Sequence, residues 1–269
     1  MDLLTVVGYF ASVFAIAHLY VGYRALSLPS RNTHKFRRSS PKESVIALLG
    51  DSHTHGHVGY SWVNQLRNSC QGSFVNAGVN GELAWNALQR LPSVLALKPQ
   101  VIILLIGSND VMGCFNAQDG QFYVQQHKLP QLPSEQFFQD NMRALLRQLE
   151  QSGVNCAVCT LPPLGEVRDS AINKDVDRFN SFIKKAAREI KIPVLDLNAC
   201  IWQLIETDDA QKSSKNTVDY SPSRGIKIGR MYISVMKYYL LGYAWDDCGA
   251  AFGLRVGFFS INLCYIHQD

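Results

Sequence analysis

The chain has 269 residues, of which 47% are hydrophobic and 18% are charged, with no low-complexity tract and no internal repeat. This composition predicts a globular protein with one α/β domain after an N-terminal segment. The formal charge of +4 is concentrated near the N-terminus, because the chain beyond residue 42 keeps 20 of the 26 basic and 21 of the 22 acidic residues. A basic nucleic-acid-binding surface on the domain is therefore excluded.

The N-terminal segment, residues 3–23, contains no Asp, Glu, Lys or Arg. As a helix it would be about 31 Å long, which matches the hydrocarbon core of a bilayer. We therefore predict a single transmembrane anchor over residues 1–24. Two alternatives stay open. One is a signal peptide cleaved after Ala15-Ile16-Ala17, although the start Met1-Asp2 lacks the usual positive charge. The other is a hydrophobic helix buried in the protein.

A basic linker is expected over residues 25–42, where polar residues accompany Pro29 and Pro41. Its basic residues follow the predicted span, so the positive-inside tendency places the domain in the cytoplasm, at the membrane. The same charges could attract anionic lipid headgroups. Cleavage of the N-terminal segment would instead export the protein.

Residues 43–269 form the predicted domain, in which apolar runs alternate with helical patterns. This alternation indicates βαβ units and a parallel sheet. Strands are expected over residues 45–49, 73–76, 101–106, 154–160 and 192–197, and helices over 58–69, 82–91, 135–152 and 172–190. The predicted fold class is α/β, a three-layer flavodoxin-like sandwich with a parallel sheet of about five strands, preceded by one N-terminal transmembrane helix.

Three of the expected strands end in short polar motifs. Gly50-Asp51-Ser52 follows the first strand, Gly78 follows the second, and Gly107-Ser108-Asn109-Asp110 follows the third. The carboxyl ends of parallel strands meet at one edge of the sheet, where ligands bind. A serine, a glycine and an asparagine at that edge are the groups needed to attack a carbonyl and hold the resulting oxyanion with N–H donors.

In order and spacing these motifs resemble blocks I, II and III of the GDSL, or SGNH, hydrolase family. Block I matches as Gly50-Asp51-Ser52 with Gly56, block II as Gly78, and block III as Gly107-x-Asn109-Asp110. The resemblance implies that Ser52 is the nucleophile. It also implies an oxyanion hole made of the Ser52 and Gly78 backbone N–H groups and the Asn109 side-chain amide. No metal and no organic cofactor are implied.

The end of the chain matches the family only in part. The family carries a C-terminal Asp-x-x-His, whose imidazole is the general base and whose carboxylate orients it. Here His267 is the only histidine after His127, and Cys264 stands three positions before it. His267 is therefore the candidate base, with no acidic partner assigned. Asp219 begins an Asp-x-x sequence that ends in proline, so a loop position is expected for it.

Other features near the motifs are expected to have structural roles. Asp51 and Asp110 are interpreted as stabilising their own loops and not as catalytic acids. His53 and His57 are four residues apart, but no third ligand accompanies them, so a metal site is not expected. Residues 107–133 form a long connection that is either a lid or a solvated insertion.

The sequence therefore predicts a serine esterase or lipase that cleaves a carboxylic ester through an acyl-serine intermediate. Its expected partners are a small-molecule or lipidic ester and, through the N-terminal helix, a membrane; nucleic acid is not expected. Two alternatives stay open. One is a non-catalytic, membrane-tethered domain of the same fold that has lost its His/Asp pair. The other is a nucleotide-binding domain, which the absence of Gly-x-Gly-x-x-Gly after the first strand disfavours.

Overall fold

A computed structural model describes residues 2–29, 31–40, 42–56, 61–165 and 167–211 of the protein. Its centre is a five-stranded parallel sheet in the order β2-β1-β3-β4-β5, which is the order of flavodoxin-like folds. The elements in chain order are α1 (Leu3–Leu26), β1 (Val45–Gly50), α2 (Ser52–His55), α3 (Trp62–Ser69), β2 (Ser73–Gly78), α4 (Ala84–Leu95), β3 (Val101–Leu105), α5 (Ser108–Phe115), α6 (Ala117–His127), α7 (Glu135–Gln151), β4 (Asn155–Cys159), α8 (Ala171–Glu189), β5 (Val194–Leu195) and α9 (Leu197–Gln211).

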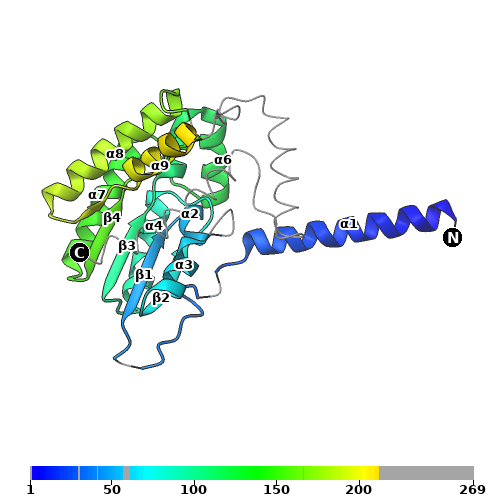
Figure 1. The fold of residues 1–269 in the computed structure, drawn as a ribbon, viewed down its shortest axis with the longest axis horizontal. Coiled ribbons are helices and arrows are strands. Elements are labelled where there is room, and N and C mark those ends of the chain that lie inside the picture. Colours follow the sequence, from blue (N-terminus) through cyan, green and yellow to red (C-terminus); the bar gives the residue numbers. More distant parts are fainter. Residues whose placement is uncertain (1, 30, 41, 57–60, 166, 212–269) are drawn as a thin grey trace.

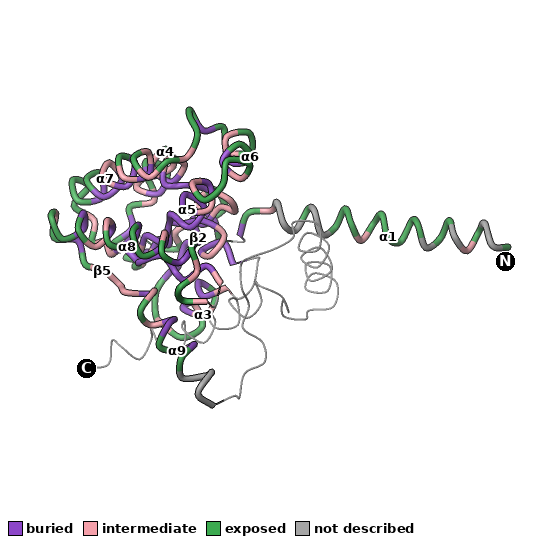
Figure 2. The backbone as a smooth tube through the Cα atoms, turned by 90° about the horizontal axis from the view of Figure 1, so that it is seen from above, coloured by how far each residue is buried: buried purple, intermediate pink, exposed green. Residues whose placement is uncertain are grey.

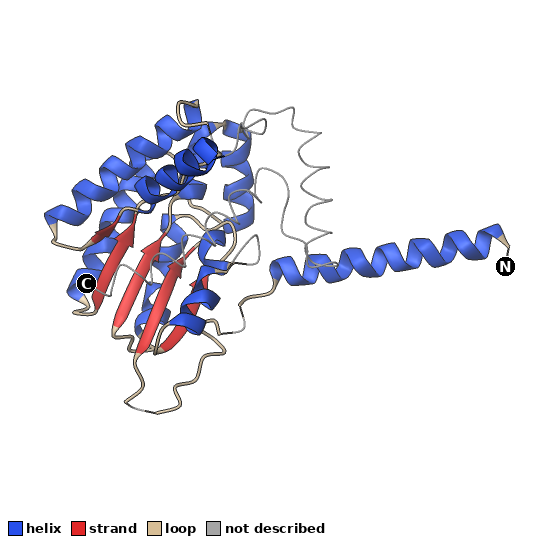
Figure 3. Cartoon of the chain, in the orientation of Figure 1, coloured by secondary structure: helices blue, strands red, loops and turns tan. Residues whose placement is uncertain are grey.

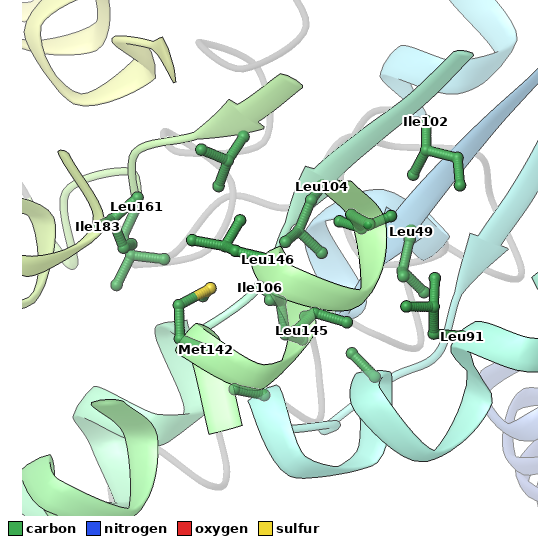
Figure 4. Close-up of a cluster of buried hydrophobic side chains, with 14 of the residues drawn as sticks. Leu49, Leu91, Ile102, Leu104, Ile106, Met142, Leu145, Leu146, Leu161 and Ile183 are labelled. Carbon is green, nitrogen blue, oxygen red and sulfur yellow. The ribbon is translucent and has the colours of Figure 1, made fainter. Parts of the chain in front are cut away.

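Helices cover both faces of the sheet and make three layers (Figure 3). Successive residues of a strand face opposite sides, so Ala47 and Leu49 of β1 pack with α4, α7 and α8, whereas Leu48 packs with α3 and α9. Figure 4 shows Leu49 in the first of these layers, together with Leu91 of α4 and Leu145 of α7. Strands β1 and β2 are buried nearly throughout, whereas β5, at one edge of the sheet, is half-buried (Figure 2). The predicted α/β class and the parallel sheet of five strands are therefore confirmed.

Some element ends differ from the sequence prediction. Helix α4 continues past its expected end at residue 91 and contains Pro92. Proline removes one helical hydrogen bond, but Leu91 and Val94 are completely buried, and their packing offsets that loss. The last strand is shorter than expected, because Leu197 begins α9, a helix that the sequence did not predict.

Helix α7 agrees with the predicted helix over residues 135–152 to within one residue. Phe138, Met142, Leu145 and Leu149 are all at most 1% exposed. The Ser134 side chain accepts a hydrogen bond from the Phe137 N–H and caps the helix. These four buried side chains recur at helical spacing and form the face of α7 that packs into the core.

The long connection over residues 107–133 contains two helices, α5 and α6, which pack against each other. Val111 of α5 and Tyr123 of α6 are both buried. These two buried apolar side chains hold the connection against the domain. The expected solvated insertion is therefore not found, whereas the alternative of a lid stays a prediction.

The N-terminal segment forms α1, one continuous helix of 24 residues, which extends away from the α/β domain (Figure 1). Among the helices in the described ranges, none is both long enough and apolar enough to cross a membrane. The predicted transmembrane helix is therefore not found.

The segment after α1 packs against the edge of the sheet at β2. The Asn76 N–H donates to the Arg31 carbonyl at 3.0 Å, and Phe36, only 7% exposed, belongs to the main hydrophobic core. The Arg38 guanidinium donates to the Leu97 carbonyl at 3.1 Å. Part of the stretch expected to be a linker thus covers a strand edge that would otherwise expose unpaired backbone groups.

Candidate active site

The three strand-end motifs meet at the carboxyl edge of the sheet, and hydrogen bonds connect them. The Val79 N–H, one residue after β2, donates to the Gly50 carbonyl at 3.0 Å. The Asn109 amide donates to the Glu82 carbonyl at 2.8 Å. These bonds join the loop after β2 to the loops after β1 and β3. The structure therefore brings together the three segments that the sequence singled out.

Ser52 is the first residue of the short helix α2 and is half-buried. Asp51 caps this helix, because its carboxylate accepts a hydrogen bond from the His53 N–H at 2.9 Å. The Ser52 hydroxyl makes no hydrogen bond within the part of the chain that the structure describes. Its backbone N–H, in the first turn of the helix, has no intrahelical acceptor. Asp51 thus stabilises the turn that carries Ser52.

Gly78 ends β2 directly beneath α2. A Cβ atom at this position would lie 2.2 Å from the His55 backbone nitrogen, so only glycine lets the helix pack this closely. The Gly78 N–H donates to the Asn76 side-chain oxygen at 3.0 Å. The backbone N–H that the sequence proposed for the oxyanion hole is therefore engaged in this structure.

Gly81 lies three residues further along the same loop, with a backbone φ of +76°. Its N–H donates to no group in the described ranges. The sequence did not point to Gly81, because a free N–H is a property of the folded loop and has no sequence signature. It is a second candidate donor beside Ser52.

Asn109 lies in the first turn of α5 and is 7% exposed. Its side-chain nitrogen donates to the Glu82 carbonyl, and its side-chain oxygen accepts a hydrogen bond from the Tyr123 hydroxyl at 2.9 Å. One of the two amide N–H groups is left without a partner in the described residues. The amide therefore retains one donor.

Three carboxyl groups in or beside the motifs are buried, those of Asp51, Glu82 and Asp110. Burial raises the pKa of Asp51 to about 7 and the pKa of Asp110 to about 8. Asp110 accepts a hydrogen bond from the Ala84 N–H at 3.0 Å, so it ties block III to the start of α4. Glu82 forms an ion pair with Arg90, but burial still raises the pKa of the Glu82 carboxyl.

The structure does not extend to several residues that the sequence analysis considered. His57, Asp219, Cys264 and His267 all lie outside the described residues. His53 is described, and burial lowers the pKa of its imidazole to about 4. It is therefore neutral near pH 7. Within the described ranges no three His, Cys, Asp or Glu side chains are grouped so that they could hold a metal ion.

A three-layer α/β fold with a serine and three candidate oxyanion donors at the carboxyl edge of its sheet is the arrangement expected of an SGNH-type hydrolase. The sequence agrees, because the model of the GDSL-like lipase/acylhydrolase family matches residues 48–225. The chain belongs to this family, and the resemblance noted from the motifs is confirmed. No match was found among curated protein sequences.

Solved structures with the same fold include esterases. A catalytic mutant of an acetylxylan esterase from Geobacillus stearothermophilus matches with a TM-score of 0.53 and 17% identity, over 78% of this chain and 99% of that one. An acetyl xylan esterase matches with a TM-score of 0.51 and 18% identity, over 72% of this chain and 98% of the other. A hydrolase from the metagenome of Lake Arreo, Spain, matches with a TM-score of 0.53 and 15% identity, over 72% and 94%. At these identities the similarity establishes the fold.

Proposed function

We propose that the protein is a carboxylic ester hydrolase that acts through an acyl-serine intermediate. The observation that carries this proposal is that the segments carrying Ser52, Gly81 and Asn109 meet at one edge of the sheet, where backbone and side-chain hydrogen bonds join the loop after β2 to the other two segments. A nucleophile beside several N–H donors is the arrangement that acyl transfer requires.

In the first half-reaction the Ser52 oxygen attacks the ester carbonyl carbon while a general base takes the hydroxyl proton. Negative charge then develops on the former carbonyl oxygen. The Ser52 N–H and the remaining Asn109 N–H would stabilise it, together with the Gly81 N–H or with the Gly78 N–H once it leaves Asn76. The intermediate collapses, the alcohol departs with the proton, and the acyl group stays on Ser52. Water then releases the carboxylic acid by the same steps in reverse.

A short acyl group is the substrate class with the best support. Two of the structural neighbours described above are named as esterases that remove acetyl groups from xylan, and we extend that acyl chemistry to this chain as part of the proposal. The alcohol component is left open.

The test is hydrolysis of p-nitrophenyl acetate by the full chain and by two variants. Ser52→Ala should reduce turnover to the background rate, because it removes the nucleophile. Ser181→Ala, which changes an exposed serine on α8, is the matched control and should behave like the parent protein. Equal activity in Ser52→Ala and the parent would refute the mechanism. A parent protein without activity would instead support a non-catalytic member of the family.

A further inference from the structure

The two ends of the Asn109 amide are held by different elements. Its nitrogen donates to the Glu82 carbonyl in the loop after β2, and its oxygen accepts from the Tyr123 hydroxyl on α6. Both Asn109 and Tyr123 are nearly completely buried, at 7% and 5% exposed. The bond between them is therefore formed away from bulk water, where hydrogen bonds are electrostatically stronger.

This pair of bonds fixes which end of the amide faces which partner. A carbonyl oxygen can only accept a hydrogen bond, so the amide nitrogen must face Glu82. The Tyr123 hydroxyl can then donate to the amide oxygen. A rotated amide would place its oxygen against the Glu82 carbonyl and lose that bond. The second N–H of the nitrogen consequently has one defined direction.

The position of Tyr123 depends on the close packing of α5 and α6. A Cβ atom at Gly120 of α6 would lie 2.9 Å from the Gly113 carbonyl of α5, so the two helices are in backbone contact there. The Tyr123 ring also lies 6.1 Å from the His127 ring, centroid to centroid. Helix α6 thus holds the tyrosine hydroxyl at a fixed place above the first turn of α5.

From this geometry we propose that Tyr123 is a positioning residue for the oxyanion hole. It acts through Asn109, and it rests on the proposed function of that amide. By donating to the amide oxygen, the hydroxyl draws electron density away from the nitrogen and strengthens the N–H that faces the developing charge. It also keeps the amide from rotating as the substrate binds.

The experiment measures kcat and KM of the full chain for p-nitrophenyl acetate in a set of variants. Tyr123→Phe removes only the hydroxyl. We expect kcat to fall about 3- to 30-fold with KM changed by less than about twofold, because the affected bond strengthens only as charge develops. Asn109→Ala should cost about 100- to 1,000-fold in kcat, as for loss of a donor from an oxyanion hole.

A double-mutant cycle separates positioning from a purely structural role. If Tyr123 acts through Asn109, then adding Tyr123→Phe to Asn109→Ala lowers kcat no further. Losses that multiply in the double variant, or an unchanged kcat in Tyr123→Phe alone, overturn the inference. Phe122→Leu is the control, since Phe122 neighbours Tyr123 but is 53% exposed, and it should leave kcat unchanged.

The Ser52→Ala variant distinguishes the two possible failures. If the parent is active and Ser52→Ala is not, the proposed function stands, and the cycle then decides the role of Tyr123 alone. If Ser52→Ala retains the activity of the parent, the acyl-serine mechanism fails and the inference about Tyr123 falls with it.

Discussion

Asp51 and Asp110 are buried carboxyl groups at the edge of the candidate active site. Burial raises their pKa values to about 7 and about 8, and the proximity of Asp51 adds to the increase at Asp110. A group with a pKa above the ambient pH is mostly protonated and neutral. A neutral acid does not repel the negative charge of a tetrahedral intermediate, whereas a carboxylate at the same place would.

These shifts predict a specific pH dependence of stability. An acid whose pKa is higher in the folded state contributes fully to stability below its unfolded pKa, near 4, and loses that contribution as the pH rises to its folded pKa. The unfolding free energy should therefore fall between about pH 4 and pH 8, with each group contributing at most about 1.4 kcal/mol per pH unit. Urea denaturation of the full chain at several pH values measures this slope.

Asp110→Asn tests the cause of that slope. Its side-chain oxygen can still accept the hydrogen bond from the Ala84 N–H, but it cannot ionise, so the slope between pH 4 and pH 8 should become shallower. Asp140→Asn is the control, because the Asp140 side chain is 62% exposed. An unchanged slope in Asp110→Asn would contradict the raised pKa.

At the scale of elements, the contact between α5 and α6 determines whether Tyr123 reaches Asn109. Gly120→Ala would place a methyl group against the Gly113 carbonyl, which is backbone and cannot move away without shifting a helix. Such overpacking costs about 1–3 kcal/mol of stability. We expect a lower melting temperature and a kcat reduced at least as much as in Tyr123→Phe.

The control for this substitution is Gly8→Ala in α1, where an added Cβ meets no atom within 4 Å. It should leave both measurements close to those of the parent. If Gly120→Ala kept the parental melting temperature and kcat, the helices would not need this close contact.

The sequence predicted those elements whose pattern lies within a few consecutive residues. The apolar run Val101–Leu105 is a strand because its own side chains require burial on both faces, and the polar motifs follow such runs directly. The sequence therefore predicted the sheet and the meeting of the three segments that carry Ser52, Gly78 and Asn109. It did not predict helix α9, whose residues show only a weak amphipathic pattern.

The sequence did not predict which side chains form hydrogen bonds at the candidate site. The bond from Tyr123 to Asn109 spans 14 residues and exists only because two helices cross at Gly113 and Gly120. Likewise, the engagement of the Gly78 N–H by Asn76 depends on the conformation of a single side chain. Neither contact has a repeat, a spacing rule or a composition signal from which it could be derived.

At the scale of the whole molecule, segments distant in sequence converge on the helix that carries Ser52. The His55 ring nitrogen lies 3.0 Å from the Ser27 carbonyl, directly after α1. Residues of the segment that follows, together with Gly78 and Val79, line a cavity of about 110 Å³. The segment after α1 is thus part of the surroundings of the candidate site.

The C-terminal region contains the proposed general base, which the proposed chemistry needs. The Ser52 hydroxyl has no hydrogen-bond partner in the described part of the chain, and burial holds the neighbouring His53 at a pKa of about 4, too low for an efficient base near neutral pH. His267 therefore remains the proposed base. To act, it must come within about 2.6 to 3.2 Å of the Ser52 hydroxyl.

His267→Ala should therefore reduce the hydrolysis of p-nitrophenyl acetate to the level of Ser52→Ala, whereas His18→Ala, at an exposed histidine of α1, should not. The companion variant is Cys264→Asp. A thiol cannot hold an imidazolium as a carboxylate does, and loss of that carboxylate costs about 10⁴ in kcat in a serine protease. Restoring it should raise kcat at least about tenfold if position 264 faces His267. Parental activity in His267→Ala would mean that the proton of Ser52 goes to another group.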